Sequence, residues 1–186
     1  MYKLINNYPV KAPGIINSNG TIYDYPDDDT LRSLGYKNLL DYSGPDTKWY
    51  QQEKLVYQED EINIFPTKEF SPAYGLKDLY YKKQNDICDY SIVSGFKWVD
   101  DDNKEHTIWL DMINQFNFAN GVFPCEFKLN YEDWHTFISE LELDRFKSEA
   151  KAHVEKCLKI CWDAKKIAKD FTEEDLYNYL IINDIN

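Results

Sequence analysis

The sequence predicts an α+β protein with a loop-rich, short-strand N-terminal half, a central β-hairpin, a long C-terminal helix and a short terminal helix. Three observations predict this fold class. Pro and Gly interrupt the first 75 residues repeatedly, two β-prone segments flank a polar turn near the middle, and no Pro or Gly occurs from Glu126 onward. We therefore expect two regions, 1–87 and 88–186, or alternatively one continuous domain.

The N-terminal region contains local signals for turns and caps. Asn19-Gly20 lies between two short apolar segments, a pattern typical of a tight β-hairpin turn. Asp29 is expected to cap a helix of one or two turns that Gly35 ends. The frequent Pro and Gly residues otherwise allow only short strands and ordered loops.

The central region predicts a β-hairpin followed by a short helix. Residues 91–99 and 105–110 alternate between apolar and polar side chains, and the segment 100–104 between them is a polar turn. Asp111 then occupies an N-cap position before a short helix over 112–119.

The C-terminal region predicts a short strand and two helices. The strand is expected within 123–129, and Asn130 is expected to cap a long helix over 131–168. A second helix begins after Thr172 and runs to about Ile182. The predicted start of the long helix depends on one apolar stripe, formed by Trp134, Phe137, Ile138 and Leu141. Because so long a helix usually needs a packing partner, we expect an oligomer or, alternatively, a helix that projects as an arm.

Composition excludes several classes of partner. The chain has 186 residues and a net charge of −12, so phosphate backbones would repel it and we expect no nucleic-acid binding. No apolar run approaches the length of a membrane span, so we expect no membrane insertion. The four cysteines form no C-x-x-C pair, which indicates free thiols made in a reducing cytosol.

One helical face carries potential metal ligands. His153, Cys157 and Cys161 are spaced by four residues and would share this face. The spacing suits either a metal or a stripe of small side chains in the core. Since no second close pair of ligands completes a structural zinc site, we expect no metal and no cofactor.

Motifs for catalysis are not recognisable. The acidic runs 27–29 and 100–102 lack the spacing of a calcium loop, and they are better interpreted as a helix cap and a hairpin turn. No nucleophile is paired with a histidine in a known pattern, and the seven glycines form no phosphate loop. We therefore expect a protein that is not an enzyme, with no catalytic residues.

Aromatic residues give the N-terminal region its candidate contact site. Trp49, Tyr50 and Tyr57 lie in a segment with many acids and further tyrosines. Such residues suit a protein interface, and they could also stack on a glycan, with nearby acids for binding or cleavage. An ordinary core is the remaining interpretation.

The C-terminal half also resembles a known family. The order of features comprises Phe96-Lys97-Trp98, Trp109-Leu110-Asp111, Asn114-Gln115-Phe116-Asn117, Tyr131-Glu132-Asp133-Trp134 and a helix over 150–168. It closes with Lys156-Cys157-Leu158-Lys159-Ile160-Cys161 and Asp170-Phe171-Thr172-Glu173-Glu174-Asp175-Leu176. This order resembles a domain of unknown function from the tail-fibre and tail-assembly regions of bacteriophages.

The resemblance implies a structural virion protein, associated with the tail or tail fibre and made in the host cytoplasm. Its partners would be other phage structural proteins, bound through protein–protein contacts. An assembly chaperone for the tail fibre, absent from the finished particle, is one alternative. A glycan-binding module is the other.

Overall fold

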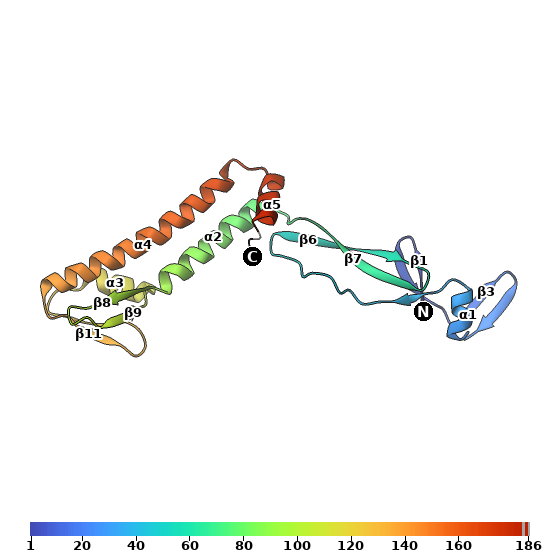
Figure 1. Ribbon diagram of the computed structural model, residues 1–186, viewed down its shortest axis with the longest axis horizontal. Coiled ribbons are helices and arrows are strands. Elements are labelled where there is room, and N and C mark those ends of the chain that lie inside the picture. Colours follow the sequence, from blue (N-terminus) through green and yellow to red (C-terminus); the bar gives the residue numbers. More distant parts are fainter. Residues whose placement is uncertain (184, 186) are drawn as a thin grey trace. The chain divides into compact units, whose positions relative to one another are not determined.

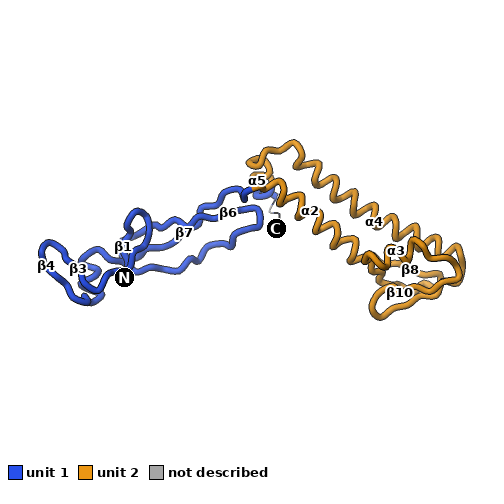
Figure 2. The backbone as a smooth tube through the Cα atoms, turned by 180° about the vertical axis from the view of Figure 1, so that it is seen from behind, with its two compact units in different colours: residues 1–74, 180–186 blue, residues 75–179 orange. Residues whose placement is uncertain are grey.

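The computed structural model describes residues 1–183 and 185, and it confirms the α+β class (Figure 1). The chain divides into two compact units (Figure 2). Unit 1 contains residues 1–74 together with the residues from Leu180 onward, and unit 2 contains residues 75–179. The division expected after residue 87 would fall inside helix α2 (Leu76–Val93).

Unit 1 begins with two short antiparallel hairpins. Their strands are β1 (Tyr2–Ile5), β2 (Tyr8–Lys11), β3 (Ile15–Ser18) and β4 (Thr21–Asp24). Asn19 and Gly20 connect β3 to β4 with φ angles of 51° and 80°. Positive φ at both central positions is what a two-residue hairpin turn requires, so the predicted Asn-Gly hairpin is confirmed.

The short helix α1 (Asp28–Ser33) follows β4. Its N-cap is Asp27, whose carboxylate accepts the Thr30 N–H at 2.8 Å, and not Asp29 as the sequence predicted. Asp29 lies inside the first turn and contacts Arg32 at 3.3 Å. All three acids of the run 27–29 could cap a helix chemically, and the backbone conformation selects the first.

A three-stranded sheet completes unit 1. It has the order β5 (Asn38–Leu39), β7 (Asn63–Pro72), β6 (Gln51–Glu59), with β5 parallel and β6 antiparallel to β7. Asp60 holds the β6–β7 turn, because its side chain accepts the N–H groups of Ile62 and Asn63, each at 2.7 Å.

Unit 2 is built on two antiparallel helices, α2 and α4 (Glu140–Lys169), which run side by side (Figures 1 and 2). The Tyr80 hydroxyl donates to the Ala164 carbonyl at 3.2 Å, and the Lys77 ammonium donates to the last carbonyl of α4 at 3.2 Å. The long helix therefore has a packing partner within its own chain. Its length no longer argues for an oligomer.

Helix α2 was not predicted, and the strand expected to begin at residue 91 begins instead at Phe96. The last turn of α2 occupies the first of the positions that alternate in the sequence, and Gly95, with φ of 71°, separates the helix from the strand. The predicted hairpin is otherwise confirmed as β8 (Phe96–Val99) and β9 (Glu105–Ile108). The buried residues of α2 are few and widely spaced among polar ones, which hides its helical period: Leu76, Tyr80, Cys88 and Ile92.

The predicted short helix is confirmed as α3 (Met112–Asn120), and Asp111 caps it by accepting the Asn114 N–H at 2.8 Å. The expected strand after it is β10 (Glu126–Lys128).

The long helix begins at Glu140 and not at residue 131. Residues 126–136 form a hairpin instead, in which β10 pairs with β11 (Trp134–Thr136). Asn130 does not cap a helix, because its side chain accepts the N–H groups of Glu132 and Asp133 in the hairpin turn. The cap of α4 is Ser139, which accepts the Glu142 N–H at 3.1 Å.

The terminal helix is confirmed as α5 (Glu173–Ile182). The Thr172 hydroxyl accepts the Asp175 N–H at 3.1 Å, and the Asp175 carboxylate accepts the Thr172 N–H at 3.0 Å. This reciprocal pair is a capping box.

The main core of unit 2 lies where the hairpins and α3 meet the first half of α4. It is rich in aromatic rings: Trp98, Phe118, Phe127, Phe137 and Phe146. Through residues 1–183 and 185, no helix has the length and apolar character needed to cross a lipid bilayer.

Candidate functional site

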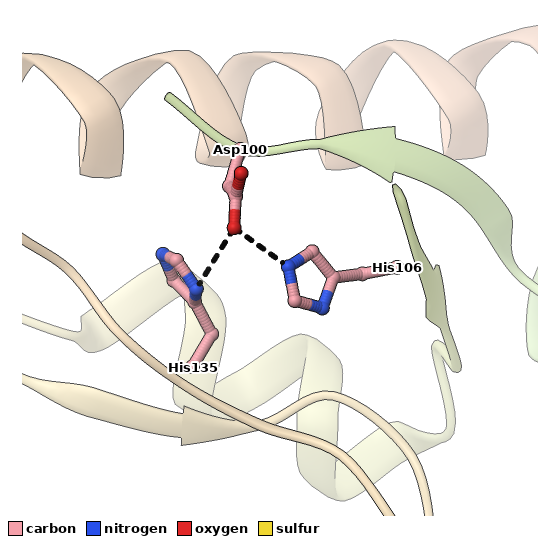
Figure 3. Close-up of side chains that lie close together, drawn as sticks. All are labelled: Asp100, His106 and His135. Carbon is pink, nitrogen blue, oxygen red and sulfur yellow. Dashed lines mark hydrogen bonds and ion pairs between the residues drawn. The ribbon is translucent and has the colours of Figure 1, made fainter. Parts of the chain in front are cut away.

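A group of buried and partly buried ionisable side chains lies beside the aromatic core of unit 2. We call it the histidine–carboxylate cluster, and it consists of Asp100, His106, Asp133, His135 and Glu142. Two hairpins and one helix supply these residues: the β8–β9 turn and β9, the β10–β11 turn and β11, and the first turn of α4. Figure 3 shows the Asp100 carboxylate between the rings of His106 and His135.

Asp100 has a double role, because its two oxygens face different partners. Oδ1 accepts the N–H groups of Asp102 at 3.0 Å and Lys104 at 2.8 Å, which closes the predicted hairpin turn. Oδ2 points inward, 2.9 Å from His106 Nε2 and 3.8 Å from His135 Nδ1. The acidic run that the sequence assigned to a turn thus also supplies a buried carboxylate.

His106 lies between two carboxylates and is almost completely buried. Its Nε2 faces Asp100, and its Nδ1 is 2.5 Å from Asp133 Oδ2. A neutral imidazole carries one N–H, so it can donate to one of these carboxylates and not to both. Both contacts are satisfied when each ring nitrogen carries a hydrogen, or when a cation replaces one of these hydrogens.

His135 and Glu142 form the second half of the cluster. His135 Nε2 is 3.1 Å from Glu142 Oε1, and Glu142 is 1% exposed. Two backbone N–H groups hold this carboxylate in place: Ile138 donates to Oε2 at 2.9 Å, and Asp101 donates to Oε1 at 3.3 Å.

The two aspartates of the cluster are stabilised as anions. Burial acts to raise the pKa of Asp100, but the hydrogen bonds from His106 and the Lys104 N–H outweigh it, so the pKa lies below its ordinary value. For Asp133, burial is likewise outweighed by His106 and Lys104, and its pKa is also lowered. Both carboxyl groups are therefore ionised at neutral pH.

Trp98 forms one wall of the cluster. Its ring centroid lies 5.0 Å from that of His135 and 5.5 Å from that of His106, and Phe146 packs against it edge-on at 5.0 Å. The ring is fully buried, and its indole N–H has no hydrogen-bond acceptor among the described residues. This apolar wall keeps water away from the two imidazoles and strengthens the electrostatic interactions between the charged groups.

The sequence contains two signals for this cluster: strand alternation and a cap motif. His106 and the buried Ile108 are two residues apart on β9, and His135 on β11 is two residues before the buried Phe137, so both histidines point inward. Ser139 and Glu142 also form an S-x-x-E pattern that marks the true start of α4.

The residues first considered as metal ligands do not gather around one point. His153 Nε2 is 3.6 Å from Cys157 Sγ, but it is also 3.1 Å from the Ser91 carbonyl, and Phe96 stacks on its ring. Cys161 Sγ instead points to the Gln84 carbonyl at 3.5 Å. All four cysteines are free thiols.

The aromatic residues of unit 1 do not form one platform. Tyr50 is 1% exposed and is a core residue, with Trp49 edge-on to it at a centroid distance of 5.4 Å. Tyr57 is half-buried on β6. Tyr57 lies six positions along the extended strand from Gln51, a distance of about 20 Å, so Trp49 and Tyr57 cannot stack on the same sugar ring.

An exposed apolar surface lies on the same side of unit 2 as α3. We call it the α3–β11 surface, and it consists of Met112, Ile113, Phe116 and Trp134, which are exposed by 85%, 72%, 69% and 56%. The three residues on α3 share one helical face because of their spacing. Phe116 and Trp134 line the same hollow, together with the core residues Phe118 and Phe127 and with polar side chains: Asn114, Asn117, Asn120, Glu126 and Lys128.

Comparison of the chain with protein-family models, with curated proteins and with solved structures found no significant match.

Proposed function

We propose that the chain is a bacteriophage virion protein of the tail or tail fibre that acts through protein–protein contacts. The α3–β11 surface is the observation that carries the proposal. Exposed clusters of large apolar side chains usually mark interaction sites, and Met, Phe and Trp are enriched at the centres of protein interfaces. The resemblance of residues 96–176 to a phage tail-region domain supplies the biological setting.

In this proposal, a structural protein of the virion covers the α3–β11 surface. The hollow between Phe116 and Trp134 accepts an apolar side chain of the partner, as in the anchor pockets of stable interfaces. The chain is made in the host cytoplasm and is incorporated into the particle during assembly.

The test uses photo-cross-linking in infected cells. A photoreactive amino acid replaces Phe116 in the full chain, and a matched control carries it at Ile160, which is exposed by 60% on α4. We expect Phe116 to give an adduct with a tail protein and Ile160 to give none. Mass spectrometry of purified particles should detect the chain.

Two outcomes distinguish the alternatives. An adduct with a fibre protein in lysates, combined with absence of the chain from particles, would identify an assembly chaperone. Absence from particles together with no adduct at Phe116 would overturn the proposal. The charge variant Phe116→Asp should reduce incorporation, and Ile160→Asp should not.

A further inference from the structure

We propose that the histidine–carboxylate cluster is a binding site for a divalent transition metal, best matched by Zn²⁺, with Asp100, His106 and His135 as ligands. This inference is independent of the proposed interaction function, because it concerns buried side chains and not the α3–β11 surface.

The three ligand atoms are already close to a coordination geometry. One ligand atom from each residue lies within 4.8 Å of the others. A tetrahedral zinc ion with bonds of about 2.0–2.1 Å holds its ligand atoms about 3.3 Å apart. Asp100 Oδ2 is 2.9 Å from His106 Nε2 and 3.8 Å from His135 Nδ1, so the two distances bracket this value.

Each proposed ligand also has a hydrogen-bond partner on its side away from the proposed ion. His106 Nδ1 faces the Asp133 carboxylate at 2.5 Å, and His135 Nε2 faces the Glu142 carboxylate at 3.1 Å. The outer oxygen of Asp100 accepts two backbone N–H groups. Metal-bound histidines almost always donate their other N–H to a carboxylate, carbonyl or water, which fixes the ring and its tautomer. Here both histidines have such a carboxylate.

Charge favours a cation at this position. Asp100, Asp133 and Glu142 place three carboxylates in a largely buried cluster. Two cations lie at the edge of the cluster: the Lys104 ammonium, 63% exposed, is 3.5 Å from Asp133, and the Arg145 guanidinium pairs with Asp101 at 2.8 Å. Buried anions require compensation by protons, cations or metals. A divalent ion between the three ligands would compensate them, and it would displace any hydrogen from His106 Nε2 and His135 Nδ1.

The positions of the ligands indicate what the metal would do. Asp100 and His106 belong to the β8–β9 hairpin, whereas His135 belongs to the β10–β11 hairpin. A bound ion would therefore join two separate hairpins next to the core. Its binding free energy would add to the stability of unit 2, since the ligands come together only in the folded chain.

The first experiment uses the full chain after treatment with a chelator, with Co²⁺ and then Zn²⁺ as probes. We expect one Co²⁺ per chain, the visible absorption of a low-coordinate cobalt site, no thiolate-to-cobalt charge-transfer band, and displacement by one equivalent of Zn²⁺. Zn²⁺ should also raise the thermal unfolding midpoint. Absence of stoichiometric binding would overturn the proposal, and a thiolate band would overturn it in favour of Cys157 and Cys161.

Variants of two histidines provide a matched comparison. His135→Gln removes a proposed ligand and should abolish stoichiometric binding, whereas His153→Gln, in the same unit, should leave it unchanged. Glu142→Gln alters the group behind His135 and should weaken Zn²⁺ binding by roughly 10–100-fold. Circular dichroism establishes that each variant is folded. Binding that survives in His135→Gln, or is lost in His153→Gln, would contradict the assignment.

Discussion

Replacing Glu142 with alanine is expected to destabilise unit 2 by roughly 3 kcal/mol. The side chain is 1% exposed, and it accepts hydrogen bonds from Ile138 N–H at 2.9 Å and from Asp101 N–H at 3.3 Å, with His135 Nε2 at 3.1 Å. Each donor that loses its acceptor in a buried site costs about 1–3 kcal/mol.

The control is Glu140, a glutamate of the same helical turn whose side chain is exposed. Glu140→Ala loses a favourable interaction with the helix N-terminus, and we expect it to cost less than about 1 kcal/mol. Glu142→Gln should lie between the two, because its amide can match one carboxylate oxygen while its NH₂ group opposes the donor at the other.

The assay is urea unfolding followed by far-ultraviolet circular dichroism, to which α2 and α4 contribute strongly. A chelator is present throughout, so that metal binding does not add to the measured free energy. With a slope of about 2 kcal/mol per molar urea, the midpoint for Glu142→Ala should fall by about 1.5 M.

Two results would refute this reasoning. The first is a cost for Glu142→Ala no greater than that of Glu140→Ala, which would mean that the buried hydrogen bonds contribute nothing net. The second is a more stable Glu142→Gln protein, which would mean that repulsion among the three carboxylates dominates the cluster.

Three further predictions concern other parts of the fold. Gly95→Ala should destabilise unit 2 by more than about 1 kcal/mol, because Gly95 has a φ of 71° and an added Cβ would lie 1.5 Å from the Ile108 carbonyl oxygen. An unchanged urea midpoint would contradict this prediction. Phe146→Ala should lower the free energy of unfolding by about 3–5 kcal/mol, because the side chain is fully buried. Ile160→Ala should lower it by about 0.5 kcal/mol or less, because that side chain is exposed. Equal losses would contradict the packing. Hydrogen bonds from the Thr172 side chain and backbone lower the pKa of Asp175, so its stabilising effect is complete above the ordinary value of 3.8 and is lost as the pH falls through the lowered pKa. An NMR titration that places the pKa at or above 3.8 would contradict this.

Several elements were predictable because their signals are local. The Asn19-Gly20 turn, the Asp111 cap of α3 and the Thr172–Asp175 capping box all depend on hydrogen bonds between residues at most three positions apart. Such contacts form wherever the local sequence allows them, whatever the rest of the chain does.

The predicted start of the long helix is wrong because the same residues fit both a helix and a strand. Residues 131–141 contain both a helical apolar stripe and a strand alternation. The hairpin with β10 forms because it buries Phe137 and places His135 beside Glu142. Trp134, Ile138 and Leu141, which the helical stripe would have buried, are exposed by 56%, 62% and 79%. Only the neighbouring strand determines which face of such a segment is buried.

The sequence by itself determined the α+β class, the central hairpin, α3 and α5, since turn and cap chemistry acts within a few residues. The tertiary structure decided that α2 packs along α4, where α4 begins, and that two histidines and three carboxylates meet. Those contacts span long stretches of chain: His106 reaches Asp133 across 27 positions, and Glu142 reaches Asp101 across 41. The cluster forms because packing of the aromatic core brings these distant segments together. A local sequence pattern does not predict contacts between residues so far apart in the chain.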